Sequence, residues 1–591
     1  WAFYAFLGEF NLACSIPYMN AYLFTLLQIL PLLFSVTTLV RSDEKLDSMD
    51  AVYYRQESNV EYVWGITLGY SCVFIIMAMT SLVLGVLIHL IGNNAPFNFG
   101  HYLFYLVTLT FPAYVFSFGI CLLVKSLVRQ RVLSLTLLML YFTITIFFVG
   151  NKWGGIFDFT GTTLPNAFSE IDGHPGIVRY LVQRFAWLMI GVGCILLSAR
   201  KFKRIPNTPK RTKLTIAVYV AWGAGIAMLC GIVLVNHGEY AVRQKFREVY
   251  EKYNRVKPLA LLSQDIDFKQ TGCRMEVSCR LCVKNQTGGK VPGIVLYLNP
   301  GLEVISVRAK EKDVPFSRDH QAIVVSQPVD QGDSLLLQIA YEGNIDEKIC
   351  YLDVPEEVTR DTWQRRYLTC RFGKRYAFLD ERFTLLTPDV LWYPVTKPLV
   401  NVGASPYERN KDFTRYMLNV MTPGGKTVIS QGHKEIREDR TSFRNDLPMV
   451  GISLCMGDYE TRSMTVDSVV CNLHVFRRRS SFFDVIDSCE NSLDTGKSEF
   501  WKFKGRSYPF PFFSLVETPV SFTAYFREER VSSEYVQPEL VFLPERLAGQ
   551  VDSPERFKEL PEYTPSIDLK NLTSILTDNA KVVLCNSWIN G

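Results

Sequence analysis

Long apolar runs fill the first part of the chain and stop near residue 236. A helix that crosses a bilayer needs about 20 mostly apolar residues, and runs of this kind recur through that part. Six of them are expected to span a membrane: residues 21–40, 62–92, 101–125, 131–150, 180–199 and 214–236. Arg184 interrupts the fifth run, and an arginine near a helix end can extend its charge toward the interface. The pattern predicts an α-helical polytopic membrane domain over residues 1–236.

Basic residues gather in alternate connections between these runs. The link 200–213 carries seven lysines and arginines, and the links 41–61 and 125–131 carry three each. The link 93–100 carries none, and the longer connection 151–179 carries only two. Basic connections lie on the cytoplasmic side of membrane proteins. We therefore expect a bacterial inner (plasma) membrane protein whose residues after about 236 are extracytoplasmic, in the periplasm.

Beyond residue 236 the pattern changes to polar and alternating segments. Residues 237–261 are polar and compatible with a helix, which predicts a helical stalk that continues the last span. Alternation with a period of two residues follows at 275–285, 293–309 and 334–343, and strand signals of this kind continue to about residue 475. The spacing predicts an all-β sandwich-like domain over residues 262–475, an architecture that simple binding modules also use.

The composition narrows the classes of function. The net charge is +5 over 591 residues, and basic residues do not alternate with aromatic residues that stack on bases, so no nucleic-acid partner is expected. No central Asp, Glu or Lys interrupts an apolar run, which disfavours an ion-coupled carrier. The chain has no GxxxxGK(S/T) loop, so ATP hydrolysis requires another polypeptide. Trp1 and Gly591 are expected to lie inside a longer protein.

Fourteen cysteines are present, and nine of them lie beyond residue 236. Cys279 and Cys282 have the spacing of half of a zinc or redox site, but no second such pair follows and no histidine is near. In a strand these two side chains point to opposite faces, so packing is the expected role. The disulfide status of the nine cysteines stays open.

Two segments of the membrane part resemble type-2 ABC exporter permeases. RSDEKLDSMDAVYYRQESNVEYVWG (41–65) resembles the segment where such permeases meet their ATPase partner, and NKWGGIFDFTGTTLPNAFSEIDGHPG (151–176) is similar to the region that holds their partly re-entrant helices. The resemblance implies a separate ABC ATPase subunit, a dimer of membrane domains and a further span before residue 1. It also implies that the ATPase contacts the first segment. The residues expected in that contact are Glu44, Lys45, Asp47, Tyr53, Tyr54 and Arg55.

Five phrases beyond the stalk resemble, in order, the aminopeptidase N family of zinc metallopeptidases. They are LLLQIAYEGNI (335–345), LLTPDVLWYPV (385–395), YMLNVMTPGGKTVISQG (416–432), ISLCMGDYETRSM (452–464) and the stretch 482–519, which contains GRSYPFPFFSLVETP. The first four resemble the β domain of that family. The last resembles the entry to its catalytic domain, where a helix ending at Gly505 precedes an extended turn through Pro509 and Pro511 and then a strand. The resemblance implies that residues 476–591 begin an α/β metallopeptidase-like domain.

The catalytic motifs of this family are missing from the chain. Its members hold zinc with H-E-x-x-H and a later glutamate, and hold the free amine of the substrate with G-x-M-E-N. Neither motif occurs in the sequence. In SSEYVQPELVFLPE (532–545), the resemblance aligns Glu539 with the amine-binding glutamate, and an ordinary carboxylate at a strand edge is the alternative. No catalytic residue, metal ligand or cofactor is therefore expected in this chain, and zinc requires ligands from beyond residue 591.

These features predict a multi-domain membrane protein, with a helical membrane domain, an all-β sandwich-like domain and the beginning of an α/β metallopeptidase-like domain. The first hypothesis is an ABC exporter-type permease subunit, energised by a separate ATPase, whose aminopeptidase-like module handles a peptide or protein outside the cytoplasm. The first alternative is a membrane-anchored zinc aminopeptidase whose zinc site lies outside this chain. The second alternative is a non-catalytic subunit of a complex.

Overall fold

The computed structural model describes residues 12–547 apart from internal gaps. The gaps are residues 46–58, 93–95, 129, 151, 202–211, 355–372, 398–411, 422–423, 467–468, 478–501, 504–505 and 525–535. The chain divides into a helical unit that extends to Gly238 and a sheet-rich unit that begins at Glu239. The two units are described separately below.

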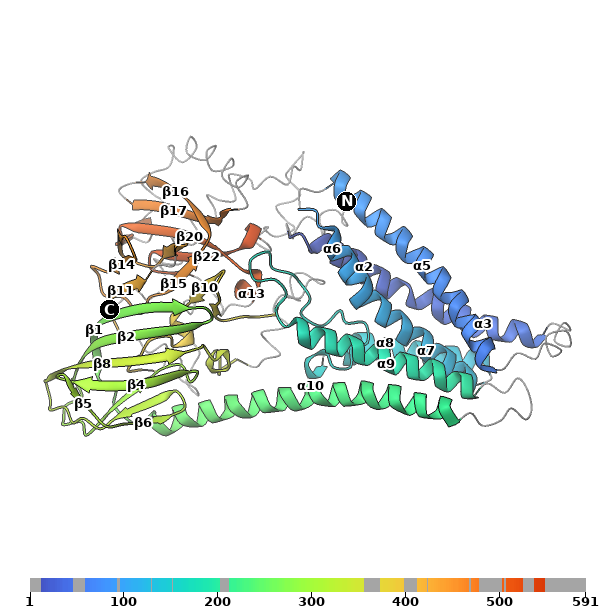
Figure 1. The fold of residues 1–591 in the computed structure, drawn as a ribbon, viewed down its shortest axis with the longest axis horizontal. Helices are drawn as coiled ribbons and strands as arrows, with labels where there is room; N and C mark the ends of the chain where they lie inside the picture. The colour runs from blue at the N-terminus through green and yellow to red at the C-terminus, as the bar shows by residue number, and fades with distance from the viewer. Residues whose placement is uncertain are drawn as a thin grey trace. The chain divides into compact units, whose positions relative to one another are not determined.

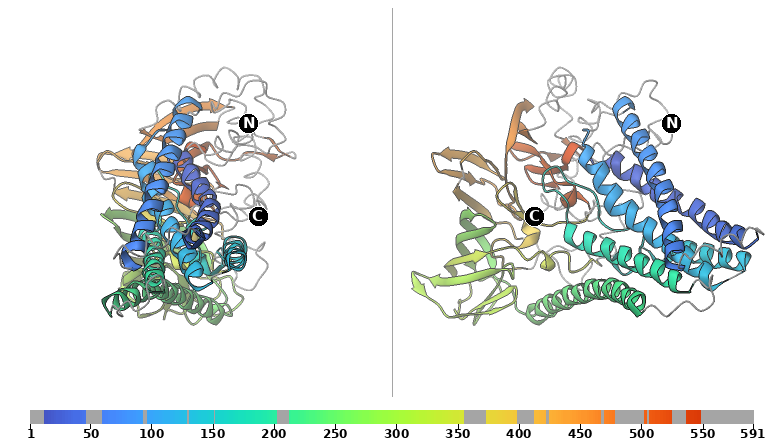
Figure 2. Two further views of the ribbon diagram at one scale, coloured as in Figure 1. Left: turned by 90° about the vertical axis from the view of Figure 1, so that its right-hand side faces the viewer. Right: turned by 45° about the vertical axis from the view of Figure 1, so that its right-hand side comes forward.

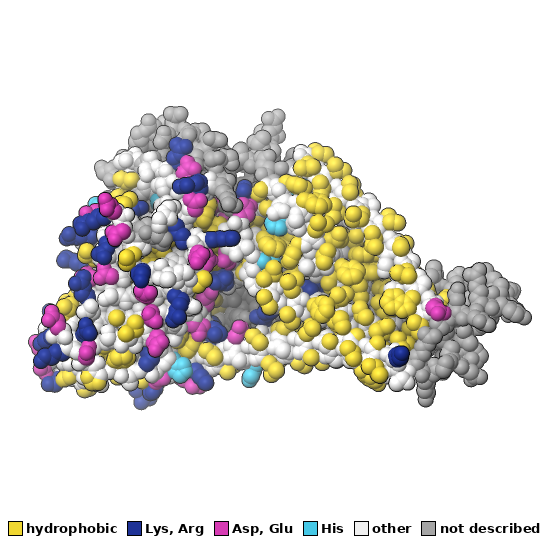
Figure 3. Space-filling view, in the orientation of Figure 1, with side chains coloured by type: hydrophobic (Ala, Val, Ile, Leu, Met, Phe, Trp, Pro, Cys, Tyr) yellow, Lys and Arg dark blue, Asp and Glu magenta, His cyan; other side chains and the backbone are white. Residues whose placement is uncertain are grey.

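The helical unit contains six helices that are long and apolar enough to cross a membrane, which confirms the expected number of apolar helices. They run over Ser15–Thr38, Val60–Ile91, Phe99–Leu127, Arg131–Val149, Ile177–Lys201 and Thr212–Tyr253. Figure 3 shows apolar side chains covering the surface of this unit, whereas charged side chains are spread over the sheet-rich unit. A membrane helix that faces lipid is expected to expose apolar side chains in this way.

Several of these spans are divided into shorter helical elements (Figure 1). The elements are α2 (Ser15–Leu27) and α3 (Ile29–Lys45), α5 (Asn59–Gly92), α6 (Phe99–Tyr105) with η1 (Leu106–Thr110) and α7 (Phe111–Leu127), α8 (Arg131–Ile144) with η2 (Thr145–Val149), η3 (Lys152–Gly155), α9 (Ile177–Lys201) and α10 (Thr212–Tyr253). The elements η1 and η2 are π-helical. A π-helical turn changes which carbonyl groups the helix itself can satisfy.

The first span is interrupted at Gln28, between α2 and α3. Pro31 has no backbone N–H and so cannot donate to the carbonyl group of Leu27 one turn earlier. The helical path resumes at once, because the Leu32 N–H donates to the Gln28 carbonyl at 3.2 Å. The interruption therefore comes from a single missing hydrogen bond in the middle of an apolar helix.

Helices α7 and α9 lie side by side in both views of the fold (Figures 1 and 2). Glycines allow this approach: a Cβ on Gly119 would lie 2.5 Å from the carbonyl oxygen of Gly191, and a Cβ on Gly191 would lie 2.7 Å from the backbone of Phe116. Small residues of this kind let membrane helices pack backbone against backbone. The contact between α7 and α9 forms the centre of the helical unit.

Arg184 is buried inside the helical unit, with 2% of its surface exposed, so the expectation that it extends toward the interface is wrong. Its guanidinium donates to the carbonyl groups of Thr108 and Leu109, each at 3.0 Å, and of Phe159 at 2.9 Å. Thr108 and Leu109 belong to the π-helical η1. Gly161 has φ of +74°, and a Cβ there would lie 2.7 Å from the guanidinium. The arginine stays inside because the fold supplies it with carbonyl acceptors.

The sheet-rich unit contains five sheets. Their strands are β1 (Ala260–Thr271), β2 (Arg274–Lys284), β3 (Ile294–Tyr297), β4 (Leu302–Ala309), β5 (Lys312–Asp313), β6 (Phe316–Asp319), β7 (Ala322–Val325), β8 (Ser334–Gly343), β9 (Phe378–Leu379), β10 (Thr384–Leu386), β11 (Arg415–Met421), β12 (Thr427–Ile429), β13 (His433–Arg437), β14 (Arg440–Arg444), β15 (Leu454–Gly457), β16 (Tyr459–Val466), β17 (Val469–Phe476), β18 (Lys502–Phe503), β19 (Arg506–Ser507), β20 (Phe512–Thr518), β21 (Val536–Gln537) and β22 (Leu540–Pro544). Short helical turns are η4 (Glu347–Ile349), η6 (Pro388–Val390), α13 (Val520–Thr523) and η10 (Glu545–Leu547).

The largest sheet has eight strands in the order β13-β14-β11-β1-β2-β8-β4-β5. Burial alternates along β2 and β8, as expected for strands with one face on a core. The pairing of β1 with β11 is parallel and joins Ser263 to Arg415, which are far apart in the sequence. Smaller sheets have the orders β12-β15-β10-β9 and β3-β7-β6.

The Trp-Tyr-Pro segment lies inside the core of the sheet-rich unit. Trp392 is fully buried, and its carbonyl group accepts a hydrogen bond from the Tyr341 hydroxyl at 3.0 Å. The Tyr393 hydroxyl accepts from the Ile452 N–H at 3.1 Å, and the Pro394 carbonyl accepts from the Gln264 amide at 3.0 Å. This segment therefore connects several strands from inside.

A mixed sheet follows, in the order β16-β17-β20-β22-β21, with parallel pairs β17–β20 and β20–β22. The expected domain boundary between residues 475 and 476 falls inside β17. The expected helix ending at Gly505 differs from what is seen just before it: Lys502–Phe503 forms β18, which pairs antiparallel with β19. A strand pair satisfies these backbone groups without a helical turn. Gly505 itself lies outside the described residues.

Helix α10 continues past the apolar part of its sequence as one element of 42 residues. Its last turns belong to the sheet-rich unit, where Phe246 and Val249 are part of the hydrophobic core. Arg243 donates to the carbonyl groups of Lys348 at 3.1 Å and Cys350 at 2.9 Å. The segment expected as a stalk thus packs partly against the sheets instead of standing in solvent.

The structure predicts a structural role for Arg184. In Arg184→Leu, three carbonyl groups lose their donor, and each unsatisfied buried group costs about 1–3 kcal/mol. We expect a clearly lower melting temperature and a lower folded yield in detergent. Arg131→Leu is the matched control, because the Arg131 guanidinium donates to the Thr38 hydroxyl at an exposed site. Equal melting temperatures for the two variants would contradict the prediction.

Candidate functional sites

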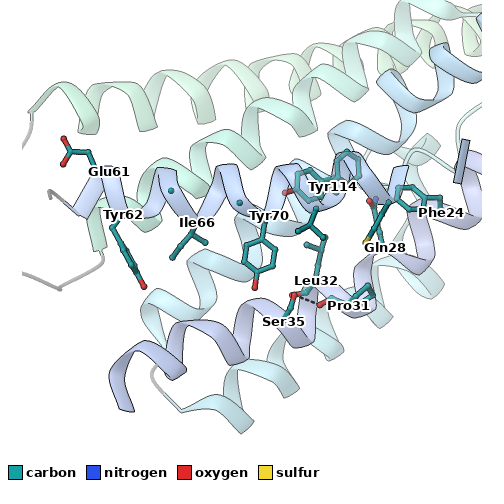
Figure 4. A pocket seen from close by; sticks show the side chains of 15 residues that line it. Phe24, Gln28, Pro31, Leu32, Ser35, Glu61, Tyr62, Ile66, Tyr70 and Tyr114 are labelled. Carbon is teal, nitrogen blue, oxygen red and sulfur yellow. Dashed lines mark hydrogen bonds between the residues drawn. The ribbon is translucent and has the colours of Figure 1, made fainter. Parts of the chain in front are cut away.

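A cavity of about 750 Å³ opens on the helical unit between α2, α3, α5 and α7 (Figure 4). Its volume lies within the range of small-molecule sites, about 300–1,000 Å³. The lining residues are mostly apolar or aromatic: Phe24, Gln28, Pro31, Leu32, Ser35, Glu61, Tyr62, Gly65, Ile66, Gly69, Tyr70, Val73, Phe74, Met77 and Tyr114. All of them come from the first three described spans.

Aromatic rings form much of the cavity wall. Phe74 stacks on Tyr114 with ring centroids 4.0 Å apart, and Phe24 lies 5.9 Å from Phe74. The Ser35 hydroxyl donates to the Pro31 carbonyl of its own helix at 2.6 Å, so this polar group is already satisfied (Figure 4). Glu61 is the one lining residue with an ionisable carboxylate, and it is exposed near the N-terminal end of α5. The walls are therefore apolar, with few polar groups.

Two glycines of α5 leave room for the cavity. Gly65 and Gly69 are one helical turn apart, and a Cβ built on either would meet no atom within 4 Å. Glycine destabilises the middle of a helix by about 1 kcal/mol relative to alanine, so packing does not explain these positions. Their effect is to keep the α5 side of the cavity open.

Gln28 is the polar residue of the cavity wall without a visible partner. It is 4% exposed, and among the described residues neither its amide nitrogen nor its amide oxygen forms a hydrogen bond. It lies at the interruption between α2 and α3, beside Pro31. A buried amide without partners costs free energy, most of all in an apolar surrounding. Sequence analysis did not single out Gln28, although a glutamine three residues before a proline inside an apolar run was a usable signal.

The residues expected to contact an ATPase lie mostly outside the described residues. Glu44 and Lys45 are the last two residues of α3. Asp47, Tyr53, Tyr54 and Arg55 fall in the gap 46–58. The expected contact surface therefore stays a prediction.

Glu539 lies in the turn between β21 and β22 of the mixed sheet. Its φ is +63°, a conformation that glycine adopts more easily than glutamate. Its carboxylate is 4% exposed and accepts a hydrogen bond from the Gly432 N–H at 2.5 Å. Its own N–H donates to the Tyr508 hydroxyl at 3.2 Å, and its carbonyl group accepts from the Ser514 N–H at 2.8 Å. The carboxylate is thus held by the backbone of the turn between β12 and β13.

Polar side chains that sequence analysis did not single out surround this turn. The Gln431 amide donates to the Gln537 amide oxygen at 2.8 Å, and the Ser453 hydroxyl donates to the same oxygen at 2.7 Å. The Ser453 N–H donates to the Gln431 amide oxygen at 2.8 Å. All three side chains are buried. The contact of this turn with residues about a hundred positions later had no local signal in the sequence.

Burial raises the pKa of Glu539 from 4.5 to about 7, against the opposing effect of the Gly432 N–H. A carboxyl group with this pKa can accept or release a proton near neutral pH. Another buried titratable group of this sheet behaves differently: burial lowers the pKa of His474 to about 3, so this imidazole is neutral at physiological pH. Glu539 is therefore a group of this region that titrates near pH 7.

The described residues do not fit a zinc ion. Among them, no three or more His, Cys, Asp and Glu side chains come together in a way that could hold a metal. Cys279 is buried in β2, where its sulfur accepts from the Gln264 amide at 3.1 Å, and Cys282 is half-buried in the same strand. No chemical step through a metal follows from this part of the chain.

No family model and no curated protein matches the sequence. The structure is similar to that of an M1 zinc metallopeptidase from Deinococcus radiodurans, with a TM-score of 0.31 and 14% identity over 44% of this chain and 57% of that chain. A two-domain M1 zinc metallopeptidase variant bound to L-tryptophan is similar over the same shares of both chains, with a TM-score of 0.31 and 13% identity. The chain thus spans little more than half the length of these structures.

The environment of Glu539 predicts a pH-dependent stability. Its pKa in the folded protein is above that of the unfolded chain, so its stabilising effect is complete below pH 4.5 and is lost as the pH rises through 7. The shift corresponds to about 3 kcal/mol. Glu539→Gln removes the ionisation, so at pH 8 the variant is expected to melt roughly 5 °C above the unsubstituted protein. At pH 4.5 the two are expected to melt together.

Glu435→Gln is the control for this measurement, because Glu435 in β13 is exposed. It is expected to leave the melting temperature unchanged at both pH values. A Glu539→Gln variant that melts at or below the unsubstituted protein at pH 8 would show that the carboxylate is stabilised in its charged form.

Proposed function

We propose that this chain is the permease subunit of an ABC-type exporter and carries an aminopeptidase-like module outside the cytoplasm. A separate ATPase subunit supplies the energy, and two membrane domains work together. The observation that supports this proposal most is the cavity in the helical unit. An enzyme anchor needs one membrane helix, and neither six helices nor an open volume of about 750 Å³ between them serves anchoring.

The construction of the cavity favours a working membrane domain. Three features meet at it: the helix interruption caused by Pro31, the buried Gln28 amide without a partner among the described residues, and the two glycines of α5. Each costs stability in an apolar helix. Features that lower stability at one place in a fold are typical of functional sites.

The energy source lies outside the sequence, because no phosphate-binding loop occurs in its 591 residues. The segment 41–65 resembles the ATPase-contacting segment of type-2 permeases. Its first residues are the end of α3, the helix that follows Gln28, and its last residues are the start of α5, the helix that contains Gly65 and Gly69. A movement of this segment would therefore act on two of the helices that form the cavity.

The sequence of the sheet-rich unit supports the proposal that this unit is an aminopeptidase-like module. The five phrases that resemble the aminopeptidase N family occur in the family's order, and the Trp-Tyr-Pro phrase forms core contacts of the unit. A mixed sheet with parallel strands follows the purely β part, as an α/β catalytic domain requires. The module then handles a peptide or protein as gate, receptor or trimming enzyme, and trimming needs zinc ligands from outside this chain.

A partner-capture experiment tests the energy source. The full protein, purified from native membranes in mild detergent, is expected to retain an ATPase whose sequence contains a phosphate-binding loop. Arg55→Glu is expected to reduce the retained ATPase about tenfold, because it reverses a charge in the expected contact. Arg204→Glu makes the same change in another basic link and is expected to have no effect. If no such ATPase is retained while peptidase activity is present and lost on chelation, the membrane-anchored zinc aminopeptidase is favoured.

The orientation has its own test. Cys273 is exposed in the turn between β1 and β2. A membrane-impermeant maleimide added to intact spheroplasts is expected to label it, because the alternation of basic links places the sheet-rich unit outside the cytoplasm. The labelling that is lost in Cys273→Ser is the signal. Labelling of Cys273 that requires permeabilised membranes would contradict the orientation.

A further inference from the structure

We infer that the cavity between α2, α3, α5 and α7 binds one lipid-like amphiphile, with an apolar body and an uncharged hydrogen-bonding group that Gln28 recognises. The inference rests on the proposed function, since it names the class of molecule that the permease handles. It is argued from the size of the cavity, the charge of its walls and the unpaired amide.

The size and walls of the cavity select an apolar body. The volume of about 750 Å³ suits one small molecule, and aromatic rings, Ile66, Val73 and Met77 line it. Val73 and Met77 are also 55% and 42% exposed on the surface of the helical unit. These two neighbouring side chains of α5 therefore line the cavity and are also part of the apolar surface that a molecule dissolved in the bilayer can contact.

The charges of the cavity exclude an anionic head group from its interior. Among the described residues, the lining contains no lysine or arginine, and its single carboxylate, on Glu61, is exposed. A charged group inside an apolar membrane site without an ion-pair partner is strongly disfavoured. The polar group of the ligand is therefore uncharged, such as a hydroxyl or an amide.

Gln28 supplies the matching polar group. Its nitrogen can donate and its oxygen can accept, and both are without partners among the described residues and shielded from solvent. Gln28 lines the cavity but its amide is shielded, so binding requires a turn about the side-chain torsions, which costs only a rotamer change. A ligand hydroxyl or amide then satisfies both atoms at once. This gain is available only to a ligand that has a donor and an acceptor.

A helix from a second copy of the chain fits this site less well. A helix with its side chains is about 10–12 Å wide, and its backbone donors and acceptors are satisfied within the helix. It would leave the Gln28 amide unpaired unless a polar side chain faced it. The small-molecule volume and the unpaired amide together favour the amphiphile.

A photolabelling experiment tests the inference. The full protein in phosphatidylcholine nanodiscs is incubated with a monoacylglycerol that carries a diazirine on its acyl chain. The sample is then illuminated, and adducts are located by peptide mass spectrometry. Adducts are expected on peptides of α3 and α5 that line the cavity. Unlabelled monolauroylglycerol is expected to compete for the site, whereas laurate at pH 8 is not.

Two substitutions distinguish labelling inside the cavity from labelling through general contact with lipid. Gly69→Leu adds a side chain to the cavity wall at a position where a Cβ meets no atom within 4 Å, and Gln28→Leu removes the recognising amide. Each is expected to lower saturable labelling about tenfold. Gly223→Leu in α10 is the matched control, because a Cβ there also meets no atom within 4 Å and Gly223 does not line the cavity. It is expected to label like the unsubstituted protein.

The melting temperature shows whether a substitution lowers labelling because it impairs binding or because it impairs folding. Gln28→Leu is expected to melt no lower than the unsubstituted protein, since it removes an unpaired buried amide. Labelling that both substitutions leave unchanged would overturn the inference. If ATPase capture succeeds and labelling does not change, the inference alone fails. If labelling behaves as expected and no ATPase is captured, the exporter proposal fails and the binding site stands.

Discussion

Hydrocarbon cannot form hydrogen bonds, so every polar group in the helical unit has to find its partner inside the protein. Arg184 shows how the fold meets this constraint. Among the described residues its hydrogen bonds include no carboxylate, and its donors go to carbonyl groups of a π-helical turn and of the connection between α8 and α9. Gln183, its neighbour, donates to the Asp158 carbonyl at 2.7 Å in the same connection. Two adjacent polar residues of α9 thus hold the segment that precedes it.

The same constraint makes the polar group at the cavity wall unusual. The Arg184 guanidinium donates to carbonyl groups of the fold. Gln28 is buried to nearly the same degree, but among the described residues its amide has no hydrogen-bond partner. Pro31, Gly65 and Gly69 weaken the helices around it. A membrane protein that only had to be stable would place leucine or alanine at these positions. The helical unit is therefore closely packed where α7 meets α9 and loosely built around α3 and α5.

The sequence predicted the parts that depend on periodicity and length. Six apolar helices and the alternating strands β2 and β8 follow from residue patterns that are local. The interior position of Arg184 could not be predicted, because the free carbonyl groups of η1 arise only when a π-helical turn forms. The environment of Glu539 could not be predicted either, because its hydrogen-bond partner Gly432 lies 107 positions earlier in the sequence. The cavity was missed because glycine and glutamine do not interrupt a hydropathy pattern.

The parallel pairing of β1 with β11 has a consequence for biosynthesis. β1 lies in the interior of the eight-stranded sheet, yet one of its two neighbours is made about 150 residues later. Pairings between distant segments form slowly, because a long loop has to close first. During synthesis β1 and β2 can pair, but the far edge of β1 keeps its backbone groups open until Arg415–Met421 has emerged. A growing chain with such an edge is prone to aggregate, so cells that make this protein are expected to depend on a chaperone acting where the sheets assemble.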